Sequence, residues 1–475
     1  MTSTTTTSEK VDKEAIFGIV PLLKGERTFG FWDFFLVLSG YGIATWCYSQ
    51  GAYIASLTGF KEMTISIFAG NLLFITIICL MVPPVVRYGV DLWCSIRSLF
   101  GYKGVRVICV LIVLVNFPWY AVASSIFASS LMQLFAAFGL NLPGFFETVL
   151  ALLCILAGTL IAIGGPVAIK WSTRIMVPVL ILVGAVVVAI AFGAVPFADI
   201  LAFEPDSGMS QRDSFAMSIE GNIAFAMSWI AALGVMPRLA KRESHAFTGN
   251  VLAFGVLVPF FLFAGGVMAI AMFVKFGYMT ADPTEMLVNL AAPMVGLLSL
   301  VCVGFANVTT QSVGSYSYAV ALKSVFTRLD YRWLCWGLAA YTAILAVWGG
   351  VEEHFGAFLS LAGLIYAPFI GLILVDFYLV RRQRYSLKSI YRLDNHSAYT
   401  YTGGFNVLAF VAMAVGIIAA LALYNPMTGE IRSELFYFLG SSAFSCLATA
   451  VTYYALSQVP AAKAYLLRDR DELTP

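Results

Sequence analysis

The sequence is poor in charge. Only 11% of its 475 residues are Asp, Glu, Lys or Arg, whereas 60% are hydrophobic; soluble domains average about 25% charged and 45–50% apolar residues. Such a small number of charged residues could not cover a soluble core of this size. The composition therefore excludes an ordinary cytosolic enzyme, and its high hydrophobic content excludes a disordered protein. The net charge of +2 is close to balance and indicates no nucleic-acid partner.

Residues that hold metals or phosphates are scarce as well. All three histidines, His245, His354 and His396, fall in expected loops, so no histidine metal site or proton relay is predicted. The eight cysteines form no C-x-x-C pair, and most lie in apolar runs, which is typical of small packing residues. A glycine-rich phosphate loop is also missing, which argues against a process driven by ATP.

Long apolar runs make up most of the chain. A bilayer core needs about 20 apolar residues per helix, and the sequence contains twelve such runs. The expected spans are 34–56, 64–84, 105–137, 147–165, 171–195, 214–236, 247–274, 291–322, 332–349, 356–380, 404–424 and 434–458. The breaks between them are too short for a soluble domain. The sequence therefore predicts an all-α polytopic membrane protein with 12 transmembrane helices.

Basic residues predict the orientation of these spans, because Lys and Arg concentrate in cytoplasmic loops. If the N-terminus is cytoplasmic, the inner segments hold 24 of the 28 Lys and Arg residues. The outer loops then hold only four, Lys61, Arg212, Lys275 and Arg432. We therefore expect a multi-pass protein of the cell membrane (plasma or inner membrane), with residues 1–30 and 459–475 as cytoplasmic tails.

Two spans that lie five apart share a pattern of glycine and polar residues. Span one contains Ser39-Gly40-Tyr41-Gly42 and then Gln50-Gly51, and span six contains Glu220-Gly221-Asn222. Because five is odd, the two spans run in opposite directions, and paired broken helices are typical of transporters built from inverted repeats. The alternative is that the glycines only permit close helix packing. The pattern predicts repeats of five spans over 31–195 and 196–382, which leaves two further helices in 383–458.

Span three places an amide beside an indole. Asn116, Trp119 and Tyr120 stand at i, i+3 and i+4 and so share one helical face, next to Pro118. A ring that stacks and an amide that donates and accepts are suited to flat polar molecules. The alternative is a packing tryptophan with an asparagine that bonds to a neighbouring helix.

Span eight carries a dense run of hydrogen-bonding residues from Ala306 to Ser315. Within it, Thr309 and Thr310 offer adjacent hydroxyls. Together with free carbonyls from a broken helix they would form an oxygen cage without a carboxylate, which suits Na⁺ better than a divalent ion. The alternative is that these hydroxyls bond to carbonyls of their own helix.

Two carboxylates lie within or next to spans. Glu220, in the first turns of span six, is a candidate proton carrier or outer gate, or a carboxylate that interacts with a helix N-terminus. Asp376 lies just before Arg381 and Arg382, and we expect it to pair with that basic cluster.

With these motifs the chain resembles the nucleobase:cation symporter family, which includes cytosine permeases, allantoin permeases and hydantoin transporters. The similarity covers roughly 20–458. It is carried by Pro368, Asp376-Phe377-Tyr378, Arg381-Arg382, Thr402-Gly403-Gly404-Phe405-Asn406, Asn116 with Trp119, Pro237-Arg238-Leu239-Ala240-Lys241, and Ala306 with Thr309-Thr310-Gln311.

The resemblance implies a leucine-transporter-like core of five plus five inverted helices, with helices 1 and 6 broken, and two peripheral helices. It implies Na⁺ as the coupling ion, held by Val37, Gly40, Ala306, Thr309 and Thr310. It also implies a substrate site formed by the following residues: Tyr41, Asn116, Trp119, Ala224, Phe225 and Gln311. Three positions depart from the family pattern: Asn116 where many relatives have Gln, Val235-Met236-Pro237 where an acidic residue is frequent, and Ser315 in place of Asn.

The sequence thus predicts a secondary active symporter, not an enzyme, that imports a small planar heterocycle such as a nucleobase, allantoin or a hydantoin. The alternatives are a vitamin permease of the same fold, for thiamine-like or pyridoxine-like rings, and coupling to H⁺ instead of Na⁺. The expected partners are the small-molecule substrate and the lipid bilayer; no nucleic acid and no protein partner is predicted.

Overall fold

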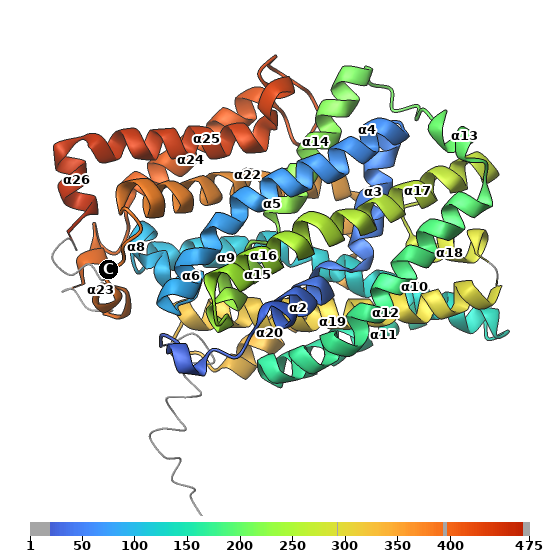
Figure 1. Cartoon of the computed structure of the whole chain (residues 1–475), viewed down its shortest axis with the longest axis horizontal. Helices are drawn as coiled ribbons and strands as arrows, with labels where there is room; N and C mark the ends of the chain where they lie inside the picture. Colours follow the sequence, from blue (N-terminus) through green and yellow to red (C-terminus); the bar gives the residue numbers. More distant parts are fainter. Residues whose placement is uncertain (1–19, 292, 393–396, 469–475) are drawn as a thin grey trace, which may run out of the picture.

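The computed structural model describes residues 20–468 except 292 and 393–396. Within those residues the chain is helical, and the only extended pairings are three isolated bridges. The helices form one bundle whose short helices gather at its two ends: α8, α23 and α26 at one end, α13 and α18 at the other (Figure 1).

The region of the first expected repeat contains the following helices. They are α2 (Phe31–Gly42), α3 (Thr45–Leu57), α4 (Phe60–Ile65), α5 (Asn71–Ile78), α6 (Val82–Tyr88), α9 (Gly104–Asn116), α10 (Pro118–Ala137), α11 (Phe145–Ile163) and α12 (Gly165–Ala194). Of these, α4, α5 and α6 are parts of one helical stretch, Phe60–Tyr88. The short helices α7 (Leu92–Ser95) and α8 (Arg97–Phe100) connect α6 to α9.

The region of the second expected repeat follows a similar order. It contains α13 (Phe197–Leu201), α14 (Gln211–Met227), α15 (Ile230–Val235), α16 (Glu243–Leu252), α17 (Val258–Phe276), α18 (Pro283–Leu290), α19 (Pro293–Val325), α20 (Tyr331–Trp348), α21 (Gly350–Glu353) and α22 (Phe355–Val375). The remaining helices are α23 (Leu387–Tyr391), α24 (Val407–Leu423), α25 (Phe436–Gln458) and α26 (Pro460–Leu466).

Seven helical stretches among the described residues are long and apolar enough to cross a membrane, or eight if α14 and the bent segment after it form one span. Their outward faces are apolar, as at Ile175 and Leu182 of α12, which are 66% and 65% exposed. Such surface suits contact with lipid rather than water. The described chain is thus an all-helical protein with several membrane spans, and the full count of twelve stays a prediction.

Two helices of the bundle are interrupted near their middle. Helix α2 ends at Gly42 and α3 begins at Thr45, with Ala44 in an extended conformation between them. Helix α14 ends at Met227 and α15 begins at Ile230, and the segment Ala232–Leu239 is bent by 40° relative to α14. Each interruption leaves helix-end carbonyls without intrahelical donors, so these carbonyls need partners from elsewhere in the bundle.

Gly51 in span one permits close helix packing and does not interrupt the helix. A Cβ on Gly51 would lie 1.8 Å from the carbonyl oxygen of Leu262, and a Cβ on Gly265 would lie 2.3 Å from that of Tyr48. Helices α3 and α17 therefore approach backbone to backbone, and small residues are the usual means of such contact between membrane helices. In span one, the Gly51 pattern reflects packing, while the interruption lies at 43–44.

Helices α24 and α25 pack on α22 along one side of the bundle (Figure 1). A Cβ on Gly371 of α22 would lie 2.3 Å from the carbonyl oxygen of Cys446, and Ser445 donates to the Gly416 carbonyl over 2.8 Å. Just after the C-terminal end of α22 the expected ion pair is confirmed: Arg381 Nε lies 2.9 Å from Asp376 Oδ2, with both side chains buried.

Candidate functional site

The last carbonyls of α2 meet the hydroxyl run of α19. Thr309 Oγ1 lies 3.3 Å from the Gly40 carbonyl oxygen and 2.7 Å from that of Ala306. Thr310 Oγ1 lies 3.4 Å from the Gly40 oxygen and 3.1 Å from the Tyr41 oxygen. These oxygens converge at the C-terminal end of α2, where the helix dipole favours a positive charge. The donor set therefore fits a monovalent cation bound by uncharged oxygens.

The structure brings together four of the five residues expected at the cation site. Val37 is buried one turn before Gly40, but no described hydrogen bond joins it to α19. A further contact lies on the other side of the interruption, where the Thr45 hydroxyl donates to Asn307 Oδ1 over 2.8 Å. Helix α19 thus contacts both the end of α2 and the start of α3.

Aromatic rings from four elements surround the space next to these carbonyls. We call this set the aromatic cage: Tyr41, Trp46, Trp119, Phe225 and Trp229, together with Asn116 and Ser228. Trp119 meets Trp46 at 5.8 Å and Phe225 at 5.5 Å between ring centroids, both edge to face. The rings leave no void large enough for a water molecule, so a ligand must separate them to enter.

Asn116 bonds to the interruption that follows α14. Its Nδ2 donates to the Ser228 carbonyl over 2.8 Å and to the Tyr366 hydroxyl over 2.7 Å. None of the described hydrogen bonds uses its Oδ1. The asparagine therefore bonds to neighbouring helices, which was the alternative considered for it, and also lines the aromatic cage.

A buried donor without a partner lies in the same cage. Trp229 is only 2% exposed, and its Nε1 makes no hydrogen bond with any described residue. An unsatisfied buried donor costs about 1–3 kcal/mol, so a ligand acceptor placed there would remove that penalty. A ligand acceptor or a water molecule would satisfy this group.

The other expected substrate residues differ in their placement. Tyr41 lines the cage and its hydroxyl lies 2.8 Å from that of Tyr120. Gln311 does not line it: its Cγ packs where a Cβ on Gly158 of α11 would lie, 2.4 Å away, and its Oε1 has no described partner. Ala224 also lies outside the lining and faces Gly363 of α22.

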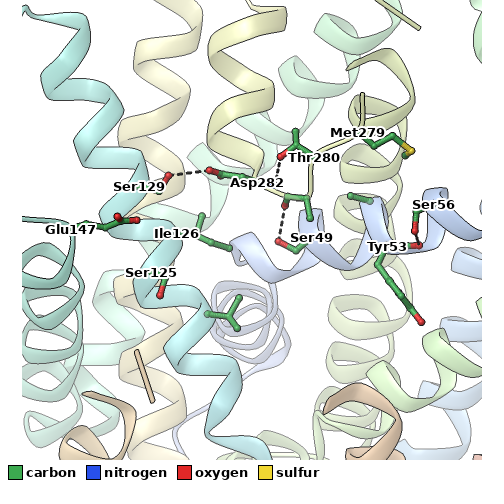
Figure 2. Close-up of a pocket in the computed structure, with 13 residues that line it drawn as sticks. Ser49, Tyr53, Ser56, Ser125, Ile126, Ser129, Glu147, Met279, Thr280 and Asp282 are labelled. Atoms are coloured by element: carbon green, nitrogen blue, oxygen red, sulfur yellow. Dashed lines mark hydrogen bonds between the residues drawn. The ribbon is translucent and has the colours of Figure 1, made fainter. Parts of the chain in front are cut away.

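A larger cavity of about 410 Å³ begins one turn beyond the cage. Ser49 follows Trp46 by three residues on α3, and Val122 follows Trp119 by three on α10, so both lie on the same faces as the cage residues. Figure 2 shows Ser49 and Ser129 bonded to the segment before α18: Ser49 donates to the Ala281 carbonyl over 2.9 Å and Ser129 to Asp282 over 3.0 Å. The cavity therefore lies next to the cage along α3 and α10.

Glu220 lines neither the aromatic cage nor the 410 Å³ cavity. It contacts α25 instead. Its Oε1 accepts from the hydroxyls of Ser441 and Ser442 at 2.7 and 2.6 Å, and from the Ser442 amide at 3.0 Å. Gly440 has φ of 67° and ψ of 175°, and this kink turns the donors toward the carboxylate. Because Glu220 is buried among donors of a peripheral helix, its contacts hold α14 against α25.

The predictions missed Trp46, Trp229, Ser228 and Tyr366. Both tryptophans stand within two residues of an interruption, Trp46 after Ala44 and Trp229 after Ser228. A tryptophan shortly after a polar or glycine residue in spans one and six was the signal in the sequence, with Trp46 four residues after Gly42 and Trp229 directly after Ser228.

The geometry defines a class of protein: a helical membrane protein in which the ends of α2 and α14 lie next to the aromatic cage. The solved structures similar to this chain agree with that fold. Mhp1, a nucleobase-cation-symport-1 family transporter solved closed with bromovinylhydantoin bound, has a TM-score of 0.77 at 18% identity, with 95% of each chain covered. A Na⁺-coupled sialic acid symporter has a TM-score of 0.65 at 14% identity, again with 95% of each chain covered.

The chain belongs to the family described as permease for cytosine/purines, uracil, thiamine, allantoin, which matches residues 21–451. A purine-uracil permease of Arabidopsis thaliana is 24% identical and covers 84% of this chain and 69% of its own length. A hydantoin permease of Microbacterium maritypicum is 24% identical, with 77% and 78% covered. The resemblance seen in the sequence is confirmed, and the chain is an integral membrane transporter, not an enzyme.

Proposed function

We propose that the chain is a cation-coupled symporter that takes up a small, planar, neutral heterocycle of the nucleobase, allantoin or hydantoin type. The observation that carries the proposal is the aromatic cage with its unpaired Trp229 N–H, next to helix-end carbonyls that converge with Thr309 and Thr310. Flat rings bind between aromatic side chains, and a ring carbonyl would accept the indole hydrogen.

The charge of the cage favours a neutral ligand. No carboxylate or cationic side chain is among the described residues that line it, so a cationic ring of the thiamine type would enter without a counter-charge. Glu220, which would supply one, faces Ser441 and Ser442 of α25 instead. A vitamin of this kind therefore stays the alternative cargo.

Na⁺ is the proposed coupling ion and H⁺ the alternative. The convergent oxygens at the end of α2 come from carbonyls and hydroxyls, which bind Na⁺ but take up no proton in the accessible pH range. The names of relatives support the substrate class, since they include purine-uracil, allantoin and hydantoin permeases.

We further propose that all twelve expected spans cross the cell membrane, with both termini in the cytoplasm. The repeats would comprise 31–195 and 196–382, and 383–458 the peripheral pair. The excess of 24 inner over four outer basic residues supports this orientation.

The test is a thermal-shift screen of the purified chain against nucleobases, ureides, hydantoins and vitamins, in NaCl and in choline chloride at equal ionic strength. A ligand at 100 times its Kd stabilises the folded state by about 2.7 kcal/mol. We expect a neutral planar heterocycle to raise the unfolding temperature more in Na⁺ than in choline. Stabilisation by thiamine-like cations alone, or a response to pH without a response to Na⁺, would contradict the proposal.

A further inference from the structure

A second cavity, of about 500 Å³, lies at the end of the bundle where α22 ends and α25 leads into α26. Four cationic residues line it: Arg381, which is buried, and Arg382, Arg384 and Lys463, which are exposed. Among the described residues the three exposed ones make no ion pair and no side-chain hydrogen bond, and no carboxylate lines the cavity. Neither the aromatic cage nor the cation site contains any of these residues.

The neighbouring Arg381 has a different role. Its guanidinium is buried and paired with Asp376 at 2.9 Å, and it donates to the Ser98 carbonyl over 2.7 Å. This arginine holds the end of α22 in the bundle. The positive charge available to a ligand therefore comes from the three exposed cations.

The backbone between the exposed residues Arg382 and Arg384 is strained. Arg382 and Gln383 have φ of 52° and 63°, in the left-handed region that few residues other than glycine adopt. Gln383 is held from both sides: its amide donates to the Phe377 carbonyl over 2.7 Å, and its Oε1 accepts from Arg87 over 3.2 Å. A strained turn that persists through such contacts, between two exposed arginines, suggests a functional reason for their position.

One wall of the cavity is apolar and open. Leu379 and Tyr454 line it and are 56% and 42% exposed. Towards the N-terminus of α25, Val451 lies three residues before Tyr454 and Leu447 four residues before Val451. They are 58% and 52% exposed. They form an apolar stripe that leads from the basic cavity along the outside of the bundle. A phosphate with hydrocarbon chains attached matches both parts, whereas free phosphate would use only the cations.

We propose that this cavity binds the phosphate headgroup of an anionic phospholipid, with Arg382, Arg384 and Lys463 around the phosphate and the acyl chains along the stripe on α25. The basic-residue pattern, on the orientation proposed above, puts the cavity at the cytoplasmic leaflet. Clusters of Lys and Arg at that level are suited to anionic headgroups.

The test is native mass spectrometry of the purified full-length chain titrated with dioctanoyl phosphatidylglycerol, dioctanoyl phosphatidylcholine or inorganic phosphate. We expect phosphatidylglycerol to bind tightest and the triple variant Arg382→Gln/Arg384→Gln/Lys463→Gln to lose affinity. Each cation removed should cost about fivefold, or about a hundredfold for three. The double variant Arg384→Gln/Lys463→Gln, which leaves the left-handed turn intact, should lose about twenty-fivefold by the same scaling.

The matched control is Lys103→Gln/Arg328→Gln/Arg332→Gln, which removes three exposed cations from the same expected side but outside the cavity. It should bind phosphatidylglycerol as the wild type does. Equal binding of phosphatidylcholine, equal binding of inorganic phosphate, or equal losses in the control would overturn the proposal. So would lipid binding that requires removal of the acidic tail 469–475, because the tail would then be the occupant. Heterocycle stabilisation measured on the same variants keeps this test separate from that of transport.

Discussion

Replacing Gly440 by alanine should weaken the attachment of α14 to the peripheral helix α25. In the structure Gly440 has φ of 67° and ψ of 175°, a backbone conformation that is open almost only to glycine. A Cβ at this position would lie 2.2 Å from Glu220 Oε2, more than 1 Å inside ordinary contact. The alanine methyl can be accommodated only if the kink changes or the carboxylate moves.

Both routes are costly. Strain of the backbone in this region is worth about 1–3 kcal/mol. Displacement of Glu220 sacrifices at least one of the hydrogen bonds it accepts from Ser441 and Ser442, and a hydrogen bond to a charged group contributes about 1.5–3 kcal/mol. We therefore expect Gly440→Ala to lower the free energy of unfolding by about 1–3 kcal/mol. At about 2 °C for each kcal/mol in a large domain, the unfolding temperature should fall by about 2–6 °C.

The assay is thermal unfolding of the purified protein in detergent, with Gly337→Ala as the control. Gly337 lies within α20, and a Cβ there would meet nothing within 4 Å, so this change should leave the unfolding temperature equal or slightly higher. Glu220→Gln in the Gly440→Ala background should add little further loss, since both changes act on one network. Equal unfolding temperatures for Gly440→Ala and Gly337→Ala would refute the reasoning.

Three further predictions concern the proposed site. Trp119→Ala should weaken heterocycle binding by roughly tenfold, because a stacking ring contributes ~1–3 kcal/mol; unchanged affinity in a titration of the folded variant would remove Trp119 from the site. Trp229→Phe keeps the ring but removes the N–H, and should weaken carbonyl-bearing ligands by about threefold to tenfold while analogues without that carbonyl bind as before. Thr310→Val should abolish most of the Na⁺ stimulation of ligand binding and keep weak basal binding; a full Na⁺ response would exclude its hydroxyl from the cation site.

Much of the fold follows from the sequence because membrane helices need long apolar runs, and these are visible without an alignment. The ion pair of Asp376 with Arg381 also follows from their spacing at the end of a span. The role of Gly51 does not, because glycine permits both a helix break and close packing. Only the position of Leu262 on another helix decides between the two.

The site was predictable where two signals coincided. Thr309 and Thr310 lie in a polar run, Gly40 lies in a glycine-rich one, and the family resemblance implied that they meet. Gln311 lies in the same run but faces α11, because helical residues only one or two positions apart point in different directions. A polar run thus identifies the helix, while the packing of its neighbours decides which side chains reach the site.

Each interruption is hydrogen-bonded to a helix from the other repeat region. This arrangement gives the proposed coupling a physical route. The carbonyls that end α2 accept from Thr309 and Thr310 on the third long helix of the second repeat region. The Ser228 carbonyl accepts from Asn116, at the equivalent place in the first. In the proposed mechanism a cation at the Gly40 oxygen would draw α2 toward α19, and the next residue, Tyr41, lines the cage. Cation and heterocycle would then favour the same arrangement of α2, so each should tighten the other by one common factor, typically worth ~1–3 kcal/mol.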